Sequence, residues 1–586
     1  MGTVSRRNVL RGSGAAAAAL AATSVGPISP ALAVERRRVA VLGGGMAGLA
    51  AAHELIDRGF EVTVYERKAL GGKARSFPVA GTAAGGRRPL PGEHGFRFFP
   101  GFYSHIPDTM ARIPFGTNEN GVFDNLVSAG VPLFPRSGGR NDMNLFGLIP
   151  DPRHLARPAD LKRFIVRELL RGSMVKPLDA TYFATRLVVF LSSCDERRHG
   201  QWESTSWWDF VRASKRNKEY QTVAARGLTR SLVAAKEEIA STRTIGNMAE
   251  AFLYSFAGVG TNGRPPDQIL NGPTNEVWID PWVTYLRGRG VRFENGTTIT
   301  GLAVASGRIT GARATTPTGP STIEADWFVS AMPVERVVPL LSAGVLDADP
   351  SLEGLKGLVT DWMNGIQFYL KRPVDITAGH IAFIDSPWSL TGISQAPHWT
   401  NDFAATYGDG NAVDCLSVDI SDWTVPGIVY GKPANRCTRE EIFTETWAQM
   451  KASLEDTGRS VLPDDVLHSW HLDPAIAWDP SRQANTNDEP LLINTINSWK
   501  LRPTARTGIS NLFMSGDFCR TNVDLATMEG ANESGRQAAN AILAESGVGG
   551  SPAPIFKLHR PPEWEALKVI DKRLYKAGKK NLFDLG

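Results

Sequence analysis

A glycine-rich turn between an apolar run and a helical run constrains the fold of this chain more than any other feature. Residues 38–42, RVAVL, have the composition of a buried parallel strand. Residues 43–48 follow with the pattern Gly-x-Gly-x-x-Gly, and residues 49–55 continue as a helical run. A strand, such a turn and a helix form the phosphate site of a doubly wound α/β domain, because the helix N-terminus directs N–H groups at the phosphate. The sequence therefore predicts a Rossmann-like nucleotide-binding domain.

Each glycine of the turn has its own steric role. Gly43 permits the tight turn, Gly45 lets the backbone approach a pyrophosphate, and Gly48 allows the helix to pack closely on the strand. Met46 and Ala47 complete the turn before the helical run, where the N–H groups of the helix N-terminus face the phosphates, and both are candidate cofactor-binding residues. We therefore expect the whole turn to contact the cofactor.

An acid lies where the adenosine ribose is expected. Residues 61–65, EVTVY, form a second predicted strand that ends at Glu66, 18 residues after Gly48. An acid at this distance accepts the ribose hydroxyls and repels a 2′-phosphate, so NADP is disfavoured. Arg67 follows, and then the Gly-Gly-basic turn that contains Gly72 and Lys73, which suits a second backbone approach to the diphosphate or the flavin.

A distant half-site separates FAD from NAD. Residues 511–515 form a predicted strand that ends in Gly516 and Asp517, and a helix opens at Met528 and Glu529. A strand-terminal aspartate can accept ribityl hydroxyls, and the positive end of a helix favours the anionic reduced flavin. Simple NAD binding needs no such half-site. We therefore predict FAD.

These motifs resemble the FAD-dependent amine oxidase and phytoene desaturase superfamily. Residues 502–508, RPTARTG, and residues 330–334, SAMPV, are similar to segments of the plant-type phytoene and ζ-carotene desaturases. The resemblance implies a Rossmann-like FAD domain interleaved with an α+β substrate domain, and it implies that Ile299 packs on the adenine. One departure concerns the substrate: Arg97 stands where that family has a histidine.

The resemblance also implies the domain boundaries. The FAD domain is expected to comprise residues 34–110, 278–345 and 495–545, and the substrate domain residues 111–277 and 346–494. Residues 546–586 form a tail with apolar and basic residues at helical spacing. Such a helix either makes a peripheral membrane contact or packs on the body of the protein, and packing is the favoured interpretation.

The N-terminus has the pattern of a bacterial Tat-type export signal. Residues 1–33 contain the pair Arg6 and Arg7, a short alanine-rich run and an Ala-x-Ala end. The run is too short to span a membrane. We expect export from the cytoplasm, by a route that carries folded proteins with their cofactors. The alternative is a disordered cytosolic N-terminus with a chance arginine pair.

Composition excludes several other classes. The formal net charge is only +4, and three of the arginines that contribute to it lie in the predicted signal. The rest of the chain is therefore nearly neutral, which argues against nucleic acid as the partner. Four widely spaced cysteines give neither a zinc-ribbon pattern nor a disulfide scaffold. His468 and His471 lie three apart in a predicted strand and face opposite sides, so no metal site is expected.

The resemblance implies an enzyme that transfers a hydride from a C–H bond to flavin N5. The expected substrate is a small lipophilic molecule of isoprenoid or carotenoid type, and the electron acceptor is a quinone or oxygen. Two alternatives stay open. One is a secreted amine oxidase that produces an imine and hydrogen peroxide, and the other is a non-catalytic flavoprotein that binds a hydrophobic ligand. The sequence assigns no catalytic residue.

Overall fold

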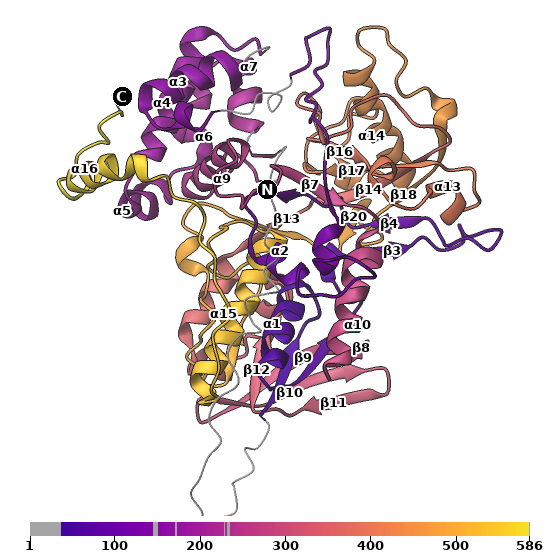
Figure 1. Ribbon diagram of the computed structural model, residues 1–586, viewed down its shortest axis with the longest axis vertical. Helices are drawn as coiled ribbons and strands as arrows, with labels where there is room; N and C mark the ends of the chain where they lie inside the picture. The colour runs from indigo at the N-terminus through magenta and orange to yellow at the C-terminus, as the bar shows by residue number, and fades with distance from the viewer. Residues whose placement is uncertain (1–36, 144–150, 170–172, 228, 231–234, 585–586) are drawn as a thin grey trace, which may run out of the picture. The chain divides into compact units, whose positions relative to one another are not determined.

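The computed structural model describes residues 37–143, 151–169, 173–227, 229–230 and 235–584 (Figure 1). The predicted export signal, with Arg6 and Arg7, lies outside the described residues. No helix in the described part of the chain has both the length and the apolar character needed to cross a membrane.

A five-stranded parallel sheet draws its strands from distant parts of the chain. The strand order is β22-β12-β1-β2-β8, and every neighbouring pair is parallel. The apolar runs Val39–Leu42 of β1 and Trp327–Val329 of β12 are buried throughout, as is typical of parallel strands covered on both faces. The strands are β1 (Arg38–Leu42), β2 (Glu61–Glu66), β8 (Arg292–Asn295), β12 (Trp327–Ser330) and β22 (Leu512–Met514).

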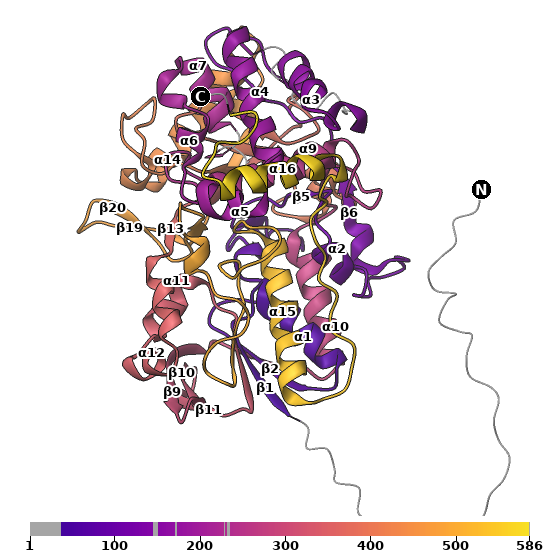
Figure 2. The ribbon, with the colours of Figure 1, turned by 90° about the vertical axis from the view of Figure 1, so that its left-hand side faces the viewer.

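Successive side chains of β1 point to opposite faces of this sheet, and each face is covered by a different layer of the protein. Val39 and Val41 pack against helices α1 (Met46–Asp57), α10 (Asp280–Gly288) and α15 (Met528–Ser546). Helices α1 and α15 lie side by side in both views (Figures 1 and 2). A side chain at Gly535 would put its Cβ 2.5 Å from the Ala47 carbonyl oxygen, so a glycine permits this close packing.

A small antiparallel sheet covers the opposite face. Ala40 and Leu42 pack there against strands β9 and β10 and against short helices that follow β12. Three strands in the order β11-β10-β9 form this sheet. Its strands are β9 (Thr298–Ala305), β10 (Arg308–Thr316) and β11 (Gly319–Ile323), and the short helices are α11 (Val334–Val337) and α12 (Ala343–Ala348).

A second five-stranded sheet, entirely antiparallel, has the order β15-β16-β17-β14-β18. Its even-numbered residues on β17, such as Val418 and Ile420, face a core shared with helix α14 (Arg439–Leu454). Thr438 and Glu441 form a capping box that fixes the start of α14. The strands are β14 (Asn364–Leu370), β15 (Ile381–Ala382), β16 (Thr391–Ser394), β17 (Asp414–Ile420) and β18 (Leu467–Leu472).

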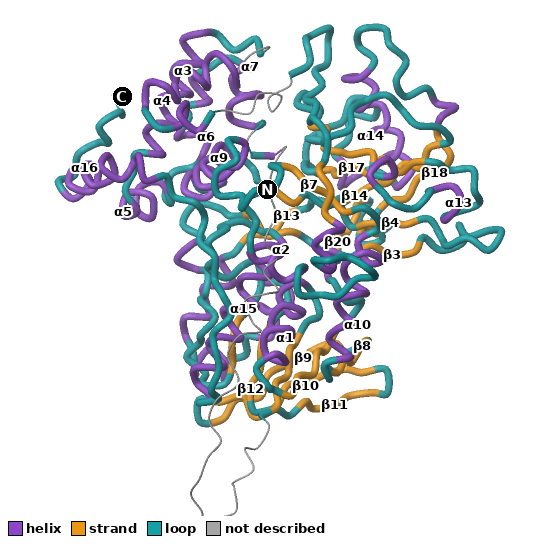
Figure 3. The backbone as a smooth tube through the Cα atoms, in the orientation of Figure 1, coloured by secondary structure: helices purple, strands orange, loops and turns teal. Residues whose placement is uncertain are grey.

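Helices form a separate layer, distinct from the strand-rich parts in Figure 3. Its longer helices are α4 (Pro177–Leu191), α9 (Thr242–Phe256) and α16 (Glu565–Lys576), and its shorter ones are α3 (Pro158–Phe164), α5 (Asp195–Arg197), α6 (Trp207–Phe210) and α7 (Lys218–Tyr220). Two other short helices lie outside this layer: α2 (His105–Met110) packs against α15, and α13 (Phe403–Thr406) packs against the sheet of β14–β18. Shorter strands are β3 (Ser76–Pro78), β4 (Pro91–Glu93), β5 (Phe99–Pro100), β6 (Leu126–Ser128), β7 (Asp267–Leu270), β13 (Val359–Asp361), β19 (Ile476–Asp479), β20 (Ala484–Asn487) and β21 (Leu491–Ile493).

The C-terminal helix α16 packs on this helical layer. The Trp564 side chain is fully buried, and its indole N–H donates to the carbonyl oxygen of Leu155 at 3.0 Å. Asp571 forms a buried ion pair with Arg197 at 3.0 Å. Val569 and Ile570 are exposed instead. The helix thus packs through the tryptophan that directly precedes its first residue and through the ion pair of Asp571, while part of its apolar surface faces outward.

Candidate functional site

A cavity of about 960 Å³ lies at the carboxyl ends of the parallel strands. Ligands bind at this edge in doubly wound folds, because the turns that follow the strands converge there. The cavity continues beyond this edge to the antiparallel sheet of β14–β18. Most of the cofactor residues predicted from the sequence line it: Gly43, Gly45, Met46, Ala47, Glu66, Arg67, Gly72, Lys73, Ile299, Gly516, Asp517 and Met528.

The glycine turns form a cradle that side chains would fill. Gly43 has a φ of +116°, and a Cβ on it would lie 2.7 Å from the Ala331 carbonyl oxygen. A Cβ on Gly45 would meet only the Cα of Gly72, at 3.8 Å, so that face of Gly45 opens on the cavity. Two backbones bare of side chains face each other here. This geometry fits the diphosphate of a dinucleotide.

The acid at the end of β2 is fixed against the glycine turn. Glu66 Oε2 accepts a hydrogen bond from the Gly44 N–H at 2.8 Å, and Oε1 accepts one from the Lys68 N–H at 2.7 Å. Ile299, in β9, lines the same cavity. The roles of both residues toward the adenosine half of the cofactor stay predictions from the sequence.

The structure differs from the sequence prediction at Glu529, which does not line the cavity. Its carboxylate accepts hydrogen bonds from the backbone N–H groups of Ser104 and His105, each at 2.7 Å, and of Ile106 at 2.9 Å. Glu529 therefore satisfies the free N–H groups at the start of α2. The first turn of α15 reaches the cavity through Met528 and Ala531 instead.

Gly48 also lies outside the cavity lining. The role that the sequence predicts for it is to let the helix pack closely on the strand. A Cβ on Gly48 would lie 1.9 Å from the Gly43 carbonyl oxygen, so only glycine lets α1 approach the turn.

The two predicted cations, Lys73 and Arg67, line the cavity but are paired with acids. Lys73 Nζ lies 3.0 Å from Glu335, and Arg67 lies 2.9 Å from Asp488.

A buried ion-pair network, which the sequence did not indicate, supports the second glycine turn. Arg75 donates to both oxygens of Glu489, at 2.8 and 2.7 Å, and to the Gly72 carbonyl oxygen at 2.7 Å. Burial opposes ionisation of Glu489, but the hydrogen bonds and charge of Arg75 outweigh it and lower the pKa of this carboxyl. No short motif links Arg75 to Glu489, because 414 residues separate them.

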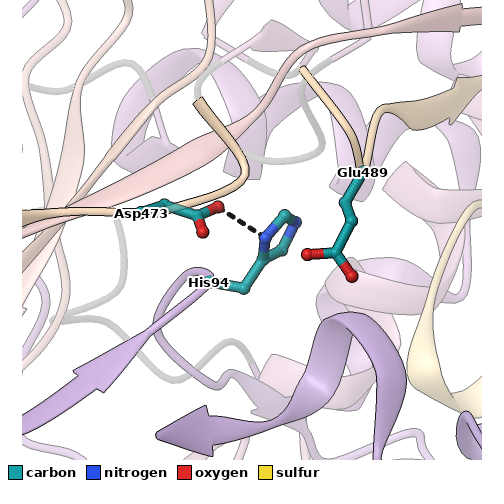
Figure 4. A group of neighbouring side chains, drawn as sticks. All are labelled: His94, Asp473 and Glu489. Carbon is teal, nitrogen blue, oxygen red and sulfur yellow. Dashed lines mark ion pairs between the residues drawn. The ribbon is translucent and has the colours of Figure 1, made fainter. Parts of the chain in front are cut away.

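His94 and Asp473 lie next to this network (Figure 4). His94 Nδ1 is 2.6 Å from an Asp473 oxygen, and one candidate ligand atom from each of His94, Asp473 and Glu489 falls within 4.8 Å of the others. Three such residues can in principle hold a metal ion. Both oxygens of Glu489 are already bound to Arg75, so the arrangement favours an ion-pair network.

Arg502 has a structural role in holding the turn that follows β22. Its side chain is buried and donates to the carbonyl oxygens of Asp517 at 3.0 Å and Phe518 at 2.9 Å. It also pairs with the buried Asp524. Cys519 in the same turn is buried, and burial raises the pKa of its thiol, so it is not a reactive thiolate.

Phenylalanines line the part of the cavity that lies beyond the glycine turns. Phe98 stacks on Phe252 with ring centroids 6.0 Å apart, and Phe252 stacks on Phe256 at 6.1 Å. Phe96 lines the same region. We call these four residues the aromatic wall. No tryptophan lines the cavity among the described residues, and six tryptophans are fully buried in cores instead.

Polar side chains interrupt this wall. His380 lies between Phe96 and Phe98, with ring centroids 5.1 and 5.0 Å away. Its Nδ1 is 2.8 Å from Asp267. Asp419 also lines the cavity, and burial raises the pKa of its carboxyl to about 7 although the charge of Arg97 acts in the opposite direction. The far part of the cavity is therefore aromatic with a few polar groups.

Comparison with known proteins agrees with this geometry. A family model described as flavin containing amine oxidoreductase matches residues 46–543. The chain is 23% identical over 551 residues to the zeta-carotene desaturase of Synechocystis sp., with 86% of this chain and 97% of that protein covered. It is 25% identical over 521 residues to the carotenoid phi-ring synthase of Streptomyces griseus, with 87% and 89% covered.

Solved structures show the same fold. Putrescine oxidase bound to putrescine matches with a TM-score of 0.57 at 12% identity, covering 87% of this chain and 99% of that one. An oxidoreductase from Methanosarcina mazei matches with a TM-score of 0.54 at 14% identity, covering 86% and 100%. The family model spans most of the chain, and the cavity fits the cofactor of that family. The protein is thus an FAD-dependent oxidoreductase, and the chain belongs to the flavin-containing amine oxidoreductase family.

Proposed function

We propose that this enzyme removes a hydride from a C–H bond of a lipophilic substrate of isoprenoid or carotenoid type. The observation that carries the proposal is the aromatic wall, which lines the same cavity as the glycine turns. An isoprenoid offers no charge to bind, so its affinity must come from buried apolar area, at about 25 cal/mol per Å². Two relatives whose names refer to carotenoids, a zeta-carotene desaturase and a carotenoid phi-ring synthase, support this substrate class.

FAD, when bound, supplies a two-electron acceptor at N5. Gly45 and Gly72 would hold its diphosphate, and Glu66 its ribose hydroxyls. The N-terminal turn of α15, which lines the cavity at Met528, would stabilise negative charge through the helix dipole. The aromatic wall orients the substrate and excludes water, so that the C–H bond is held close to its acceptor.

Anaerobic bleaching of the flavin tests this proposal. ζ-Carotene in detergent should reduce the flavin of the purified holoenzyme, and putrescine should not. Reduction by putrescine with release of hydrogen peroxide in air would establish the amine oxidase alternative. Bound flavin that neither substrate class reduces would favour a non-catalytic binding protein. A quinone and oxygen can then be compared as acceptors by the rate at which each restores the flavin absorbance.

We also propose that the protein is exported by the Tat route, from the Arg6-Arg7 pair and the Ala-x-Ala end of residues 1–33. Changing both arginines to lysine should abolish export in a Tat-competent bacterium and leave cytoplasmic protein with bound FAD. Unchanged export of the double variant would contradict the proposal. A peripheral membrane contact is a further proposal, supported by the exposed Val569 and Ile570 of α16 and tested by sedimentation with anionic vesicles.

A further inference from the structure

We propose that the substrate carries a neutral hydroxyl group and that Thr391 and Asp419 bind it at the far end of the cavity. This inference rests on the proposed function, because it concerns the lipophilic substrate of the same site. It narrows the substrate class to isoprenoid alcohols. An uncharged hydroxyl group also distinguishes this substrate from the amine that an amine oxidase would bind.

Strand pairing places the two residues on one face of the antiparallel sheet. Thr391 on β16 is directly opposite Asp419 on β17, and Ala382 on β15 is directly opposite Thr391. Directly opposed residues project to the same side of a sheet. Val418 and Ile420 point the other way, into the core with α14, so Asp419 must project away from that core. Ala382, Thr391 and Asp419 all line the cavity.

Buried polar atoms in this region have no hydrogen-bond partner within the protein. Among them are Nε of Arg97, Oγ1 of Thr391 and Oδ1 of Asp419, and all three residues line the cavity. Oδ1 of Asp267 and Nε2 of His380, which also line the cavity, lack a hydrogen-bond partner as well. Buried polar atoms are nearly always hydrogen-bonded, because an unpartnered one has lost its water without compensation. Five such atoms on lining residues indicate a polar partner that enters the cavity.

Glycine keeps space free beside the Asp419 carboxylate. A Cβ on Gly95 would lie 2.8 Å from Asp419 Oδ1, so any other residue would press on that oxygen. The carboxylate already accepts a hydrogen bond from the Phe96 backbone N–H. The aromatic wall therefore begins next to the unpartnered oxygen. A long apolar molecule lying along the wall can place a polar end there.

The charges favour a neutral group over an ion. The Arg97 guanidinium compensates the nearby charges of Asp419 and Glu93, so an ammonium group would meet a cation that already balances these carboxylates. A carboxylate would be repelled by Asp419 and by Asp267, which is already paired with His380 at 2.8 Å. A hydroxyl needs one acceptor and one donor. Asp419 Oδ1 supplies an acceptor, and Thr391 Oγ1 or Arg97 Nε supplies a donor.

The test compares geranylgeraniol with the C20 hydrocarbon that lacks only its hydroxyl. Binding to the holoenzyme is followed by the change in flavin absorbance, which needs no turnover. We expect the alcohol to bind at least about tenfold more tightly than the hydrocarbon, because only the alcohol can form a hydrogen bond with a buried charged or polar group. Thr391→Val should reduce this ratio while leaving hydrocarbon affinity unchanged, and Asp419→Leu should reduce it further.

Ser417→Ala is the matched control. Ser417 lies on β17 two residues before Asp419, is buried, and does not line the cavity. Comparing the alcohol-to-hydrocarbon ratio between variants cancels any difference in how the two probes partition into detergent. The ratio in Ser417→Ala should equal that of the parent protein.

The outcomes separate this inference from the proposed function. Equal affinity for the two probes, or a preference that survives in Thr391→Val and Asp419→Leu, would overturn the inference alone. Tight binding of putrescine and of neither isoprenoid would overturn the proposed function and the inference together. Bound FAD in every variant, measured from its absorbance, excludes loss of the cofactor as the cause of a changed ratio.

Discussion

The Glu66 carboxylate accepts a hydrogen bond from the Gly44 N–H at 2.8 Å, so the acid at the end of β2 and the glycine turn at the end of β1 are fixed to one another. The strands themselves are paired in parallel, with Val64 opposite Val41. This contact holds the acid at the cavity edge before any nucleotide binds. Pre-organisation of this kind lowers the entropy that binding must overcome.

We predict that Glu66→Ala weakens FAD retention by about 1–3 kcal/mol, because buried ribose hydroxyls lose their charged acceptor. Equilibrium dialysis of the holoenzyme with FAD quantified by fluorescence measures the change. Glu61→Ala is the matched control, since Glu61 begins the same strand and pairs with Arg292 at 2.8 Å. If Glu66→Ala retains FAD as well as Glu61→Ala does, the adenosine lies elsewhere.

Two neighbouring glycines should separate cofactor binding from folding. Gly45→Ala should leave the Tm of the apoprotein unchanged, because its Cβ would meet only the Gly72 Cα at 3.8 Å. It should weaken FAD binding at least about tenfold, or about 1.4 kcal/mol, because that methyl group occupies the diphosphate cradle.

Gly48→Ala, unlike Gly45→Ala, should lower the stability of the apoprotein. Its Cβ would lie 1.9 Å from the Gly43 carbonyl oxygen, so we expect the apoprotein to lose about 1–3 kcal/mol of stability. Thermal unfolding of both apoproteins and titration with FAD give the two readouts. A normal FAD affinity in Gly45→Ala would contradict the placement of the diphosphate.

Asp419 should make the stability of the apoprotein depend on pH. Burial raises the pKa of this carboxyl from 3.8 to about 7 in the folded protein. Between these values the folded state binds a proton that the unfolded state has lost, so this group's contribution to stability falls as the pH rises from about 4 to 7 and is constant above. Asp419→Asn should remove this contribution. Urea unfolding at pH 5 and pH 8 measures it, and an identical pH dependence in both proteins would contradict the pKa.

The cofactor half of the cavity could be predicted from sequence because its signals are local. Gly43 to Gly48 form one turn, and β1, β2 and β22 are short apolar runs that precede recognisable residues. Backbone geometry decides the role of each glycine, and that geometry follows from the strand–turn–helix order. Ile299 is different, since its predicted role came from the resemblance alone.

The far half of the cavity could not be predicted because it depends on pairing between distant segments. The Arg75–Glu489 pair spans 414 residues, and the neighbourhood of Thr391 and Asp419 depends on the strand register of β16 and β17. Glu529 shows the same limit. Its place at the start of a helix next to a cofactor is typical of a flavin site, but the N–H groups of α2 compete for its carboxylate, and they lie 423 to 425 residues away in the chain.

Glu529 should therefore matter for folding more than for the cofactor. Its carboxylate lies 2.8 Å from His105 Nδ1, and both side chains are almost fully buried. Glu529→Ala would leave His105 and the N–H groups of α2 without their acceptor, and we expect a loss of about 3–5 kcal/mol in the free energy of unfolding. Glu545→Ala, on the exposed end of the same helix, should change it by less than about 0.5 kcal/mol. Urea unfolding of the apoproteins measures both. If the Glu529→Ala apoprotein is as stable as the parent but cannot bind FAD, Glu529 acts in cofactor binding and not in folding.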